Sequence, residues 1–435
     1  MKKIICMFVS GLLGVALVSS CFAASTSVDA LIKKLVDKNI LTEKEARDLK
    51  GEIASDEKMV REDGLKASLP SWIQDMKLKG DFRLRYQYER KKDDSEARAR
   101  GRIRYRLGLE TALNPKTKLA VGLASSERKS TNTNDPRSTN SSFQNTFERP
   151  EIALDYAYAE YQAMDSLKLA GGIFKLPDYL WEPSDILWDT DINPQGGAFH
   201  WEHALGSNLT PYLNSGIVLL DENSTADRAD PFMNYTQAGV KFKQGDWSAN
   251  VAGIYYSFNG TKGACPDWSA ATNTGITSAS NGSCTGALKY DYDSLGAAAE
   301  IAMATPFNIE AIPEVGVFGE IIHNVDTNDI QGDLNNLDDG DGFSIGARIG
   351  DKKVVSKGQW QLKYIYVDLG KDAFVDFTPD SDRYGGKTDI RSHEAILEYG
   401  LNKNISLALD YYQSRRIKAT RNPEQVVQAD INFKF

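Results

Sequence analysis

Apolar and polar residues alternate along most of the chain beyond residue 76. Residues 76–88 carry an apolar side chain at most even positions and a charged or polar one at each odd position. Residues 98–110 repeat the pattern, with arginines at every even position from Arg98 to Arg106 and apolar residues between them from Ile103 onward. A period of two predicts β-strands that have one apolar and one polar face.

Sixteen segments share this strand-like pattern, and the connections between them alternate in length. The predicted strands are residues 75–89, 98–112, 117–126, 151–162, 167–176, 198–205, 211–222, 232–243, 247–258, 289–304, 309–323, 342–350, 359–369, 389–401, 405–416 and 425–435. Short connections alternate with mostly long, polar ones, which is typical of membrane barrels with turns on one side and loops on the other. The sequence therefore predicts an all-β fold, a transmembrane antiparallel β-barrel of about 16 strands with a short N-terminal helical tail. Closure follows because every strand edge in lipid must be paired.

The last predicted strand carries the sharpest local signal. Val427, Ala429, Ile431, Phe433 and Phe435 share one face of this strand, and polar residues occupy the other. A terminal aromatic residue on an alternating strand resembles the signal by which outer-membrane barrels are recognised for assembly. The barrel-assembly machinery is therefore an expected partner, together with outer-membrane lipid.

The N-terminus predicts a secretory signal. Positive residues at the start, an apolar run and small residues up to Ala23 indicate a signal peptide over residues 1–23. The segment that ends at Cys21 also fits a lipoprotein cleavage box, so lipidation of Cys21 stays open.

A leader precedes the predicted barrel, which covers residues 71–435. Residues 24–70 are predicted to form a periplasmic helical leader and linker, in which Thr42 and Glu45 have the spacing of a capping box. Two interpretations of these helices stay open. Their narrow apolar faces pack either against a copy of themselves or against a barrel mouth, or else the leader is frayed.

Charge and hydropathy narrow the function classes. The net charge of −9 argues against a nucleic-acid binder, which usually has a basic surface. The mean hydropathy of −0.42 would also suit a soluble exported β-protein. A membrane barrel hides its apolar surface in alternation, however, so hydropathy does not separate the two alternatives.

Few residues suggest catalysis or cofactor binding. His200 and His203 lie three residues apart, which on a strand places them on opposite faces, so we expect no metal site. No nucleophile with a base and no glycine-rich phosphate loop stands out, so we expect neither an enzyme nor a cofactor. The acidic loop 326–341 is either a solvated loop or a calcium site. Cys265 and Cys284 lie in one polar loop of an exported chain and predict a disulfide.

Several motifs resemble those of a known family. Residues 31–46, the first-strand segment 80–86, and residues 172–177 and 188–197 after the fifth predicted strand resemble the corresponding segments of Gram-negative putative porins. A more distant similarity is to phosphate-selective porins. The resemblance implies a sixteen-stranded passive channel in the outer membrane, often a trimer, that passes small hydrophilic solutes or ions.

The resemblance also suggests where a constriction would lie. In general porins the third long loop folds into the lumen, which here would be residues 177–197. Its expected acidic residues are Asp178, Glu182, Asp185, Asp189 and Asp191.

Arginines on the polar face of the first two predicted strands would oppose this loop. The expected pore-lining residues are Arg83, Arg85, Arg102, Arg104 and Arg106. Opposed charges in a narrow throat would create a strong transverse field. A structural or adhesion barrel without an open channel is the alternative function.

Overall fold

Two units make up the chain, Met1–Gln74 and Asp75–Phe435. The computed structural model describes residues 32–38, 42–51, 70–91, 97–127, 135–147, 149–222, 230–261, 292–325, 340–418 and 422–435. The predicted signal peptide, including Cys21, lies outside these residues.

The first unit contains short helices. Residues 32–37 and 43–51 are helical, and a further turn of helix, α4, spans Ser71–Gln74. The Thr42 backbone N–H donates to Glu45 Oε2 at 2.8 Å, and the Glu45 N–H donates to Thr42 Oγ1 at 3.3 Å. This reciprocal pair confirms the predicted capping box. In the described part of the chain, no helix has the length and apolar character needed to cross a bilayer.

The second unit is a single antiparallel sheet. Its described strands are sixteen of seven residues or more and one of two residues, β4. Their bounds are β1 Lys77–Lys91, β2 Arg98–Asn114, β3 Thr117–Ser126, β4 Ser141–Ser142, β5 Glu151–Met164, β6 Leu167–Ile173, β7 Gln195–Glu202, β8 Leu209–Leu219, β9 Phe232–Gln244, β10 Trp247–Asn259, β11 Asp293–Ala304, β12 Glu314–Asn324, β13 Asp341–Gly350, β14 Trp360–Leu369, β15 Ile390–Gly400, β16 Ile405–Arg416 and β17 Glu424–Lys434. Each of the sixteen predicted strands is present.

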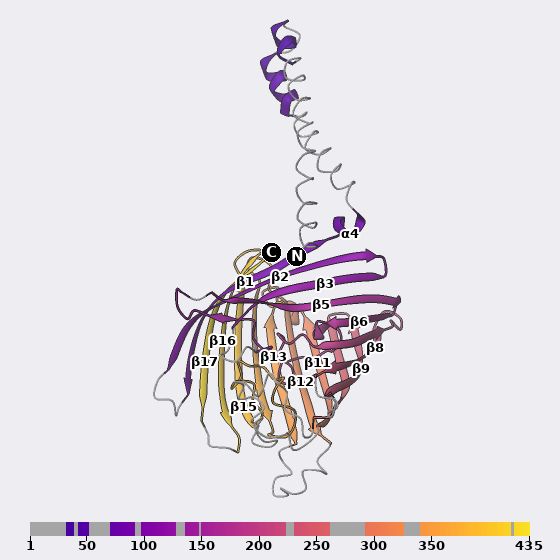
Figure 1. Cartoon of the computed structure of the whole chain (residues 1–435), viewed down its shortest axis with the longest axis vertical. Helices are drawn as coiled ribbons and strands as arrows, with labels where there is room; N and C mark the ends of the chain where they lie inside the picture. The colour runs from indigo at the N-terminus through magenta and orange to yellow at the C-terminus, as the bar shows by residue number, and fades with distance from the viewer. Residues whose placement is uncertain are drawn as a thin grey trace, which may run out of the picture. The chain divides into compact units, whose positions relative to one another are not determined.

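The last strand closes the sheet into a barrel. Neighbouring strands pair in sequence order around the barrel, and β17 pairs with β1, with Phe82 opposite Phe433 (Figure 1). Phe435 exchanges two backbone hydrogen bonds with Gly80, of 2.9 and 3.0 Å. A Cβ atom at Gly80 would lie 2.5 Å from the Phe435 ring, so only glycine leaves room for this aromatic end. The predicted closed antiparallel barrel is confirmed.

Several strand boundaries differ from the prediction by two to five residues, and two of the differences have a plain structural reason. β7 lies three residues earlier than expected, because Gly196 and Gly197 continue its ladder with β6 instead of forming a loop. β12 begins at Glu314 instead of residue 309, because Pro306–Asn308 forms a 3-10 turn before it.

The barrel has an apolar outside and a filled inside. Outward side chains such as Leu123, Ile217, Ile345 and Leu409 are exposed, as lipid-facing residues are in a barrel without its lipid. Numbered along the chain, the second, third and seventh long loops are L2 (127–150), L3 (174–194) and L7 (370–389). Contacts described below place L3, L7 and part of L2 inside the barrel.

Candidate functional site in the barrel lumen

The inward face of β1 and β2 carries a row of arginines. Arg85 binds both carboxylate oxygens of Asp430 on β17, at 2.8 and 2.9 Å, and also contacts Asp382 of L7 at 3.0 Å. Arg83 donates to Asn140 Oδ1 of L2 at 2.6 Å and lies 3.6 Å from Asp430. The alternating pattern explains this arrangement, because every second residue of a strand faces the same side.

The arginines of β2 continue the row. Arg102 donates to Gln87 at 3.0 Å and to Ser138 of L2 at 3.3 Å. Arg104 and Arg106 share the carboxylate of Asp81, at 2.9 and 2.7 Å. We call the five side chains Arg83, Arg85, Arg102, Arg104 and Arg106 the arginine row.

One predicted acid of L3 faces the arginine row directly. Asp191 accepts from Arg106 at 3.4 Å, and its second oxygen accepts the backbone N–H and hydroxyl of Thr139, both at 3.0 Å. Asp191 therefore joins L3, L2 and the β2 wall at one point.

The other predicted acids of L3 have different neighbours. Asp189 is buried and accepts the N–H groups of Asp191 and Ser381, both at 2.9 Å. Burial, together with the nearby Asp191 carboxylate, raises the pKa of Asp189. Asp178 is exposed toward one end of the lumen. These two acids do not contact the arginine row.

Glu182 and Asp185 anchor L3 to the far side of the lumen. Tyr256 of β10 donates its hydroxyl to Glu182 at 2.7 Å. Burial and the neighbouring Glu320 carboxylate raise the pKa of Glu182 above its ordinary value. Asp185 accepts from Arg383 of L7 at 3.2 and 3.3 Å.

L7 contributes charged lumen residues that the sequence analysis missed. Its Asp382 lies beside Arg85 in the arginine row, and its Arg383 is buried between Asp185 and Glu394. Burial alone would raise the pKa of Asp382, but Arg85 and Arg102 lower it overall. One feature of the sequence could have indicated that L7 enters the lumen. Residues 373–377 form a mostly apolar run, which is unusual for a solvated loop. Its members Ala373, Phe374, Val375 and Phe377 are buried.

L3 and L7 also lock together through their backbones. The N–H of Asp189 donates to Thr378 O at 2.7 Å, and the Thr378 hydroxyl donates to Leu187 O at 2.7 Å. Around these bonds a hydrophobic cluster unites both loops with inward residues of β3, β5–β10, β12, β14 and β15. Of the residues described, none in this cluster belongs to β1, β2, β16 or β17. The apolar filling therefore lies away from the wall formed by β1, β2, β16 and β17.

Two cavities described in the structure lie beside this wall, at opposite ends of the arginine row. The loop-side cavity has a volume of about 440 Å³ and is lined by Arg98, Arg100, Arg102, Asn140 and Asp382, among others. The turn-side cavity of about 470 Å³ is lined by Asp81, Arg104, Arg106, Asp178 and Asp191, among others. Arg83 and Arg85 are not among the residues that line either cavity. They lie in the row between the residues that line the loop-side cavity and those that line the turn-side cavity.

The two histidines that were weighed as a metal pair lie in different surroundings. His200 contacts Asn214 at 2.6 Å, and His203 stacks on Trp201, so the two histidines do not converge. Within the described ranges, no group of three or more His, Cys, Asp or Glu side chains is placed to hold a metal ion. Cys265, Cys284 and most of the acidic loop 326–341 lie outside the described residues, so the disulfide and calcium alternatives stay predictions.

Solved structures with a similar fold are outer-membrane porins. Pseudomonas putida OprB at high pH has a TM-score of 0.52 and 9% identity over 83% of this chain and 94% of its own. Vibrio cholerae OmpT with loop L8 deleted has a TM-score of 0.45 and 12% identity, over 83% of this chain and 100% of its own. Salmonella typhi OmpF in complex with daunomycin has a TM-score of 0.45 and 10% identity, over 83% of this chain and 97% of its own.

Sequence comparison gives the family. No curated protein matches the chain at a significant level. The sequence profile of a family described as putative porin matches residues 88–285 and 287–435, which is most of the chain. The closed sixteen-strand barrel, its inward third loop and its polar lumen agree with that match. The chain belongs to the putative porin family and is an outer-membrane channel.

Proposed function

We propose that small hydrophilic solutes and ions cross the barrel along its β1–β2 wall, from the loop-side cavity past the arginine row to the turn-side cavity. The single observation that carries this proposal is that both cavities are lined by members of one arginine row. Away from this wall, packed apolar side chains of L3 and L7 fill the lumen, together with the buried ion pairs of Arg383 with Asp185 and Glu394.

The narrowest part of this path would lie where loops touch the row. Arg83 meets Asn140, Arg85 meets Asp382, and Arg106 meets Asp191, so each contact joins the wall to a different loop. The predicted constriction at L3 becomes, in this proposal, one shared by L2, L3 and L7.

The lining charges favour a strong transverse field over a strong ion preference. The loop-side cavity has five cationic and five anionic side chains, which are Lys91, Arg98, Arg100, Arg102 and Arg137 against Glu89, Glu127, Asp135, Asp382 and Glu424. The turn-side cavity has five against four, which are Lys79, Arg104, Arg106, Lys175 and Lys434 against Asp81, Asp155, Asp178 and Asp191. Near-balanced charges would orient water and admit polar solutes of either sign.

Unsatisfied arginine nitrogens support contact with passing solutes. The buried Nε atoms of Arg83, Arg100 and Arg102 have no hydrogen-bond partner within the described structure. A buried guanidinium nitrogen normally has a partner, so water or an anionic group in the path would satisfy these donors.

Cysteine substitution tests the path. Asn140→Cys places a thiol at the loop-side cavity, and Ser344→Cys places one on β13, away from the β1–β2 wall and beside Ser184 of L3. Treatment with a trimethylammonium-ethyl thiosulfonate reagent should remove most of the single-channel conductance of N140C and leave S344C unchanged. The treated wild-type chain controls for Cys265 and Cys284. Block of S344C without block of N140C would place the path on the side that L3 and L7 fill.

The homotrimer expected from the family resemblance stays a prediction, as do the partners of the N-terminal leader.

A further inference from the structure

Three arginines face the lipid side of the barrel on one stretch of its wall. They are Arg90 of β1, Arg391 of β15 and Arg415 of β16. Ser392 and Ser414, the strand neighbours of the last two, are buried inside the barrel, so the arginines next to them point outward. The same alternation turns every other Lys or Arg of the described strands toward the lumen. Since β15, β16, β17 and β1 are consecutive in the sheet (Figure 1), we call the three side chains the outer arginine patch.

The patch lies beyond a girdle of outward tyrosines, toward the loops. The Tyr366 ring lies 5.1 Å from that of His393, and Arg391 is two residues nearer to the loop end of β15 than His393. Arg415 is four residues nearer to the loop end of β16 than Tyr411. Tyrosines mark the membrane interface, and a strand rises about 3.3 Å per residue. The arginines therefore lie at the depth of the lipid headgroups.

The charges within the patch are only partly balanced. Arg391 and Arg415 stand directly opposite each other across β15 and β16, an arrangement that destabilises a sheet when both charges have the same sign. Asp368 of β14 accepts from Arg391 Nε at 2.6 Å, yet the Arg391 side chain stays 37% exposed. In the described part of the chain, neither Arg415 nor Arg90 has a carboxylate partner. An anion between Arg391 and Arg415 would relieve their repulsion.

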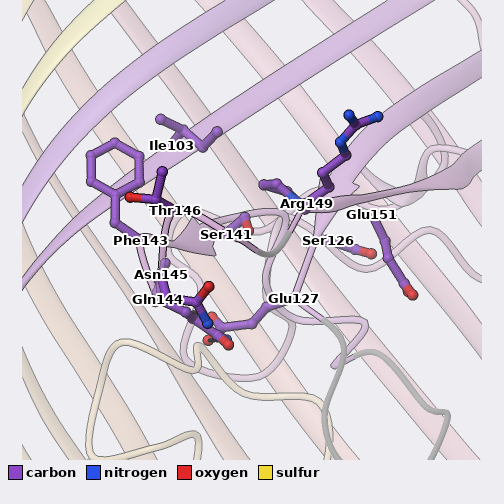
Figure 2. Close-up of a pocket in the computed structure, with 12 residues that line it drawn as sticks. Ile103, Ser126, Glu127, Ser141, Phe143, Gln144, Asn145, Thr146, Arg149 and Glu151 are labelled. Atoms are coloured by element: carbon purple, nitrogen blue, oxygen red, sulfur yellow. Dashed lines mark hydrogen bonds between the residues drawn. The ribbon is translucent and has the colours of Figure 1, made fainter.

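Neighbouring parts of the described outward surface have no such excess of positive charge. At the same end of the barrel, the outward charged side chains of β11 and β13 are the acids Asp293 and Asp341. On the other side of the patch, strand β4 of L2 pairs with β2, beside a pocket that shares Glu127 with the loop-side cavity. Figure 2 shows Arg149 in this pocket together with Glu151 and Glu127. Outward positive charge is therefore concentrated on β15, β16 and β1.

We propose that the outer arginine patch binds the phosphate groups of a glycolipid in the outer leaflet. The longer loops of an outer-membrane barrel face the cell exterior, and the leaflet at that end consists mainly of phosphorylated glycolipid. A guanidinium group holds a phosphate through two parallel N–H···O bonds, and Arg391 and Arg415 offer two such groups on backbones about 5 Å apart. The acyl chains would lie along exposed apolar residues nearer the membrane centre, such as Leu397 and Leu409.

This inference is independent of the proposed permeation path. None of the three arginines lines the loop-side or the turn-side cavity. Single-channel conductance should therefore be the same in the wild type and in variants of the patch, which also shows that these variants fold.

Native mass spectrometry of the full barrel tests the proposal with a defined probe. The barrel is titrated in dodecyl maltoside micelles with purified lipid A that carries two phosphates, and the bound lipid is counted. In the double variant Arg391→Gln/Arg415→Gln the affinity should fall about tenfold, because charge-assisted hydrogen bonds are lost. Gln413→Ala changes an uncharged residue on the same outward face of β16 and should bind as the wild type does. Unchanged binding in the double variant would overturn the proposal.

Removal of the phosphates separates charge recognition from adsorption of acyl chains. The same lipid without phosphate should bind the wild type about tenfold more weakly and should bind the double variant equally well. Arg391→Lys/Arg415→Lys keeps the charge and should recover part of the binding, since a lysine holds a phosphate as a point charge. Equal affinity of the wild type for the two lipids would contradict the assigned headgroup.

A contact between two copies of the chain is the competing use of the patch. The same spectra report the number of protomers in each particle. Oligomers that dissociate in the double variant while each protomer keeps its lipid would overturn the proposal in favour of a protein contact. Should the double variant not fold, Arg90→Gln removes a cation that has no carboxylate partner in the described structure and should lower lipid binding severalfold. Wild-type affinity in R90Q would then count against the patch.

Discussion

The two sides of the lumen differ in chemistry, although buried ion pairs of Arg383 with Asp185 and Glu394 also occur on the side that L3 and L7 fill. Along β8–β14, aromatic and aliphatic side chains of L3 and L7 pack against the wall, with Phe374 5.0 Å from Tyr256 and 5.5 Å from Phe258 between ring centroids. Along β1, β2 and β17, charged side chains meet across two cavities. Apolar packing fixes a loop in place, whereas paired charges leave room for water.

This contrast indicates a division of labour between the two sides. A buried apolar cluster gains its stability from excluded water, so it cannot also serve as a hydrophilic path. Charged groups that keep part of their hydration can hold a field across a path without closing it. Loss of the apolar filling should therefore change stability, and loss of the arginine row should change selectivity.

The largest effect is expected from Phe374→Ala in the apolar filling. Phe374 is fully buried, and truncation of a buried phenylalanine costs about 3–5 kcal/mol. L7 should loosen, which would lower the denaturant midpoint of the heat-modifiable barrel and make single channels larger and noisier. Ion preference should keep its sign. A reversal potential that changes sign in F374A would break the proposed division.

The next effect concerns the arginine row. Replacing Arg102, Arg104 and Arg106 by glutamine leaves Asp81, Asp191 and Glu127 without these cations, so anion preference should fall. The reversal potential under a salt gradient measures this change. Arg348→Gln is the control, because Arg348 is an inward arginine on β13 that pairs with Glu314 and lines neither cavity. Equal shifts in both variants would remove the special role of the row.

A smaller effect should follow pH through Glu182. Its pKa is raised in the folded barrel from the ordinary 4.5, so the protonated form is the one that the folded state favours. The resulting stability is fully present below the ordinary value and is lost as pH rises through the raised one. The heat-modification midpoint should fall over that window in the wild type and less steeply in E182Q. Identical slopes of the midpoint against pH in the wild type and in E182Q would contradict the raised pKa of Glu182.

The smallest effect is expected at Asn140. Asn140→Ala removes the 2.6 Å contact with Arg83 where L2 meets the row. Single-channel conductance should rise modestly, and the free energy of unfolding should change by no more than about 1 kcal/mol. A conductance that falls in N140A would show that Asn140 holds the path open instead of narrowing it.

The barrel was predictable because its pattern is local. Consecutive residues carry both the alternation along β1 and β2 and the order of long and short connections. From this local pattern all sixteen strands could be predicted. The capping box at Thr42 and Glu45 was visible for the same reason. The predicted strand ends were less accurate where a glycine continues the backbone pairing of two strands, as Gly196 does between β6 and β7.

The interior of the lumen was only partly predictable. Asp191 and Arg106 do meet, but the partner of Arg85 in the loops is Asp382 of L7, 297 residues away in the chain. No periodicity reports which distant loop enters the lumen. The passage of L2 through the wall at Ser141 and Ser142 was likewise hidden, because a two-residue strand has no pattern.

Single-channel recording of the refolded mature barrel in a planar bilayer tests the central claim most directly. The proposed path along the arginine row predicts stable, small conductance steps with a weak ion preference, because the cavities have nearly balanced charges. Persistent silence from a correctly folded, heat-modifiable barrel would contradict the account, since L3 and L7 would then close the lumen completely.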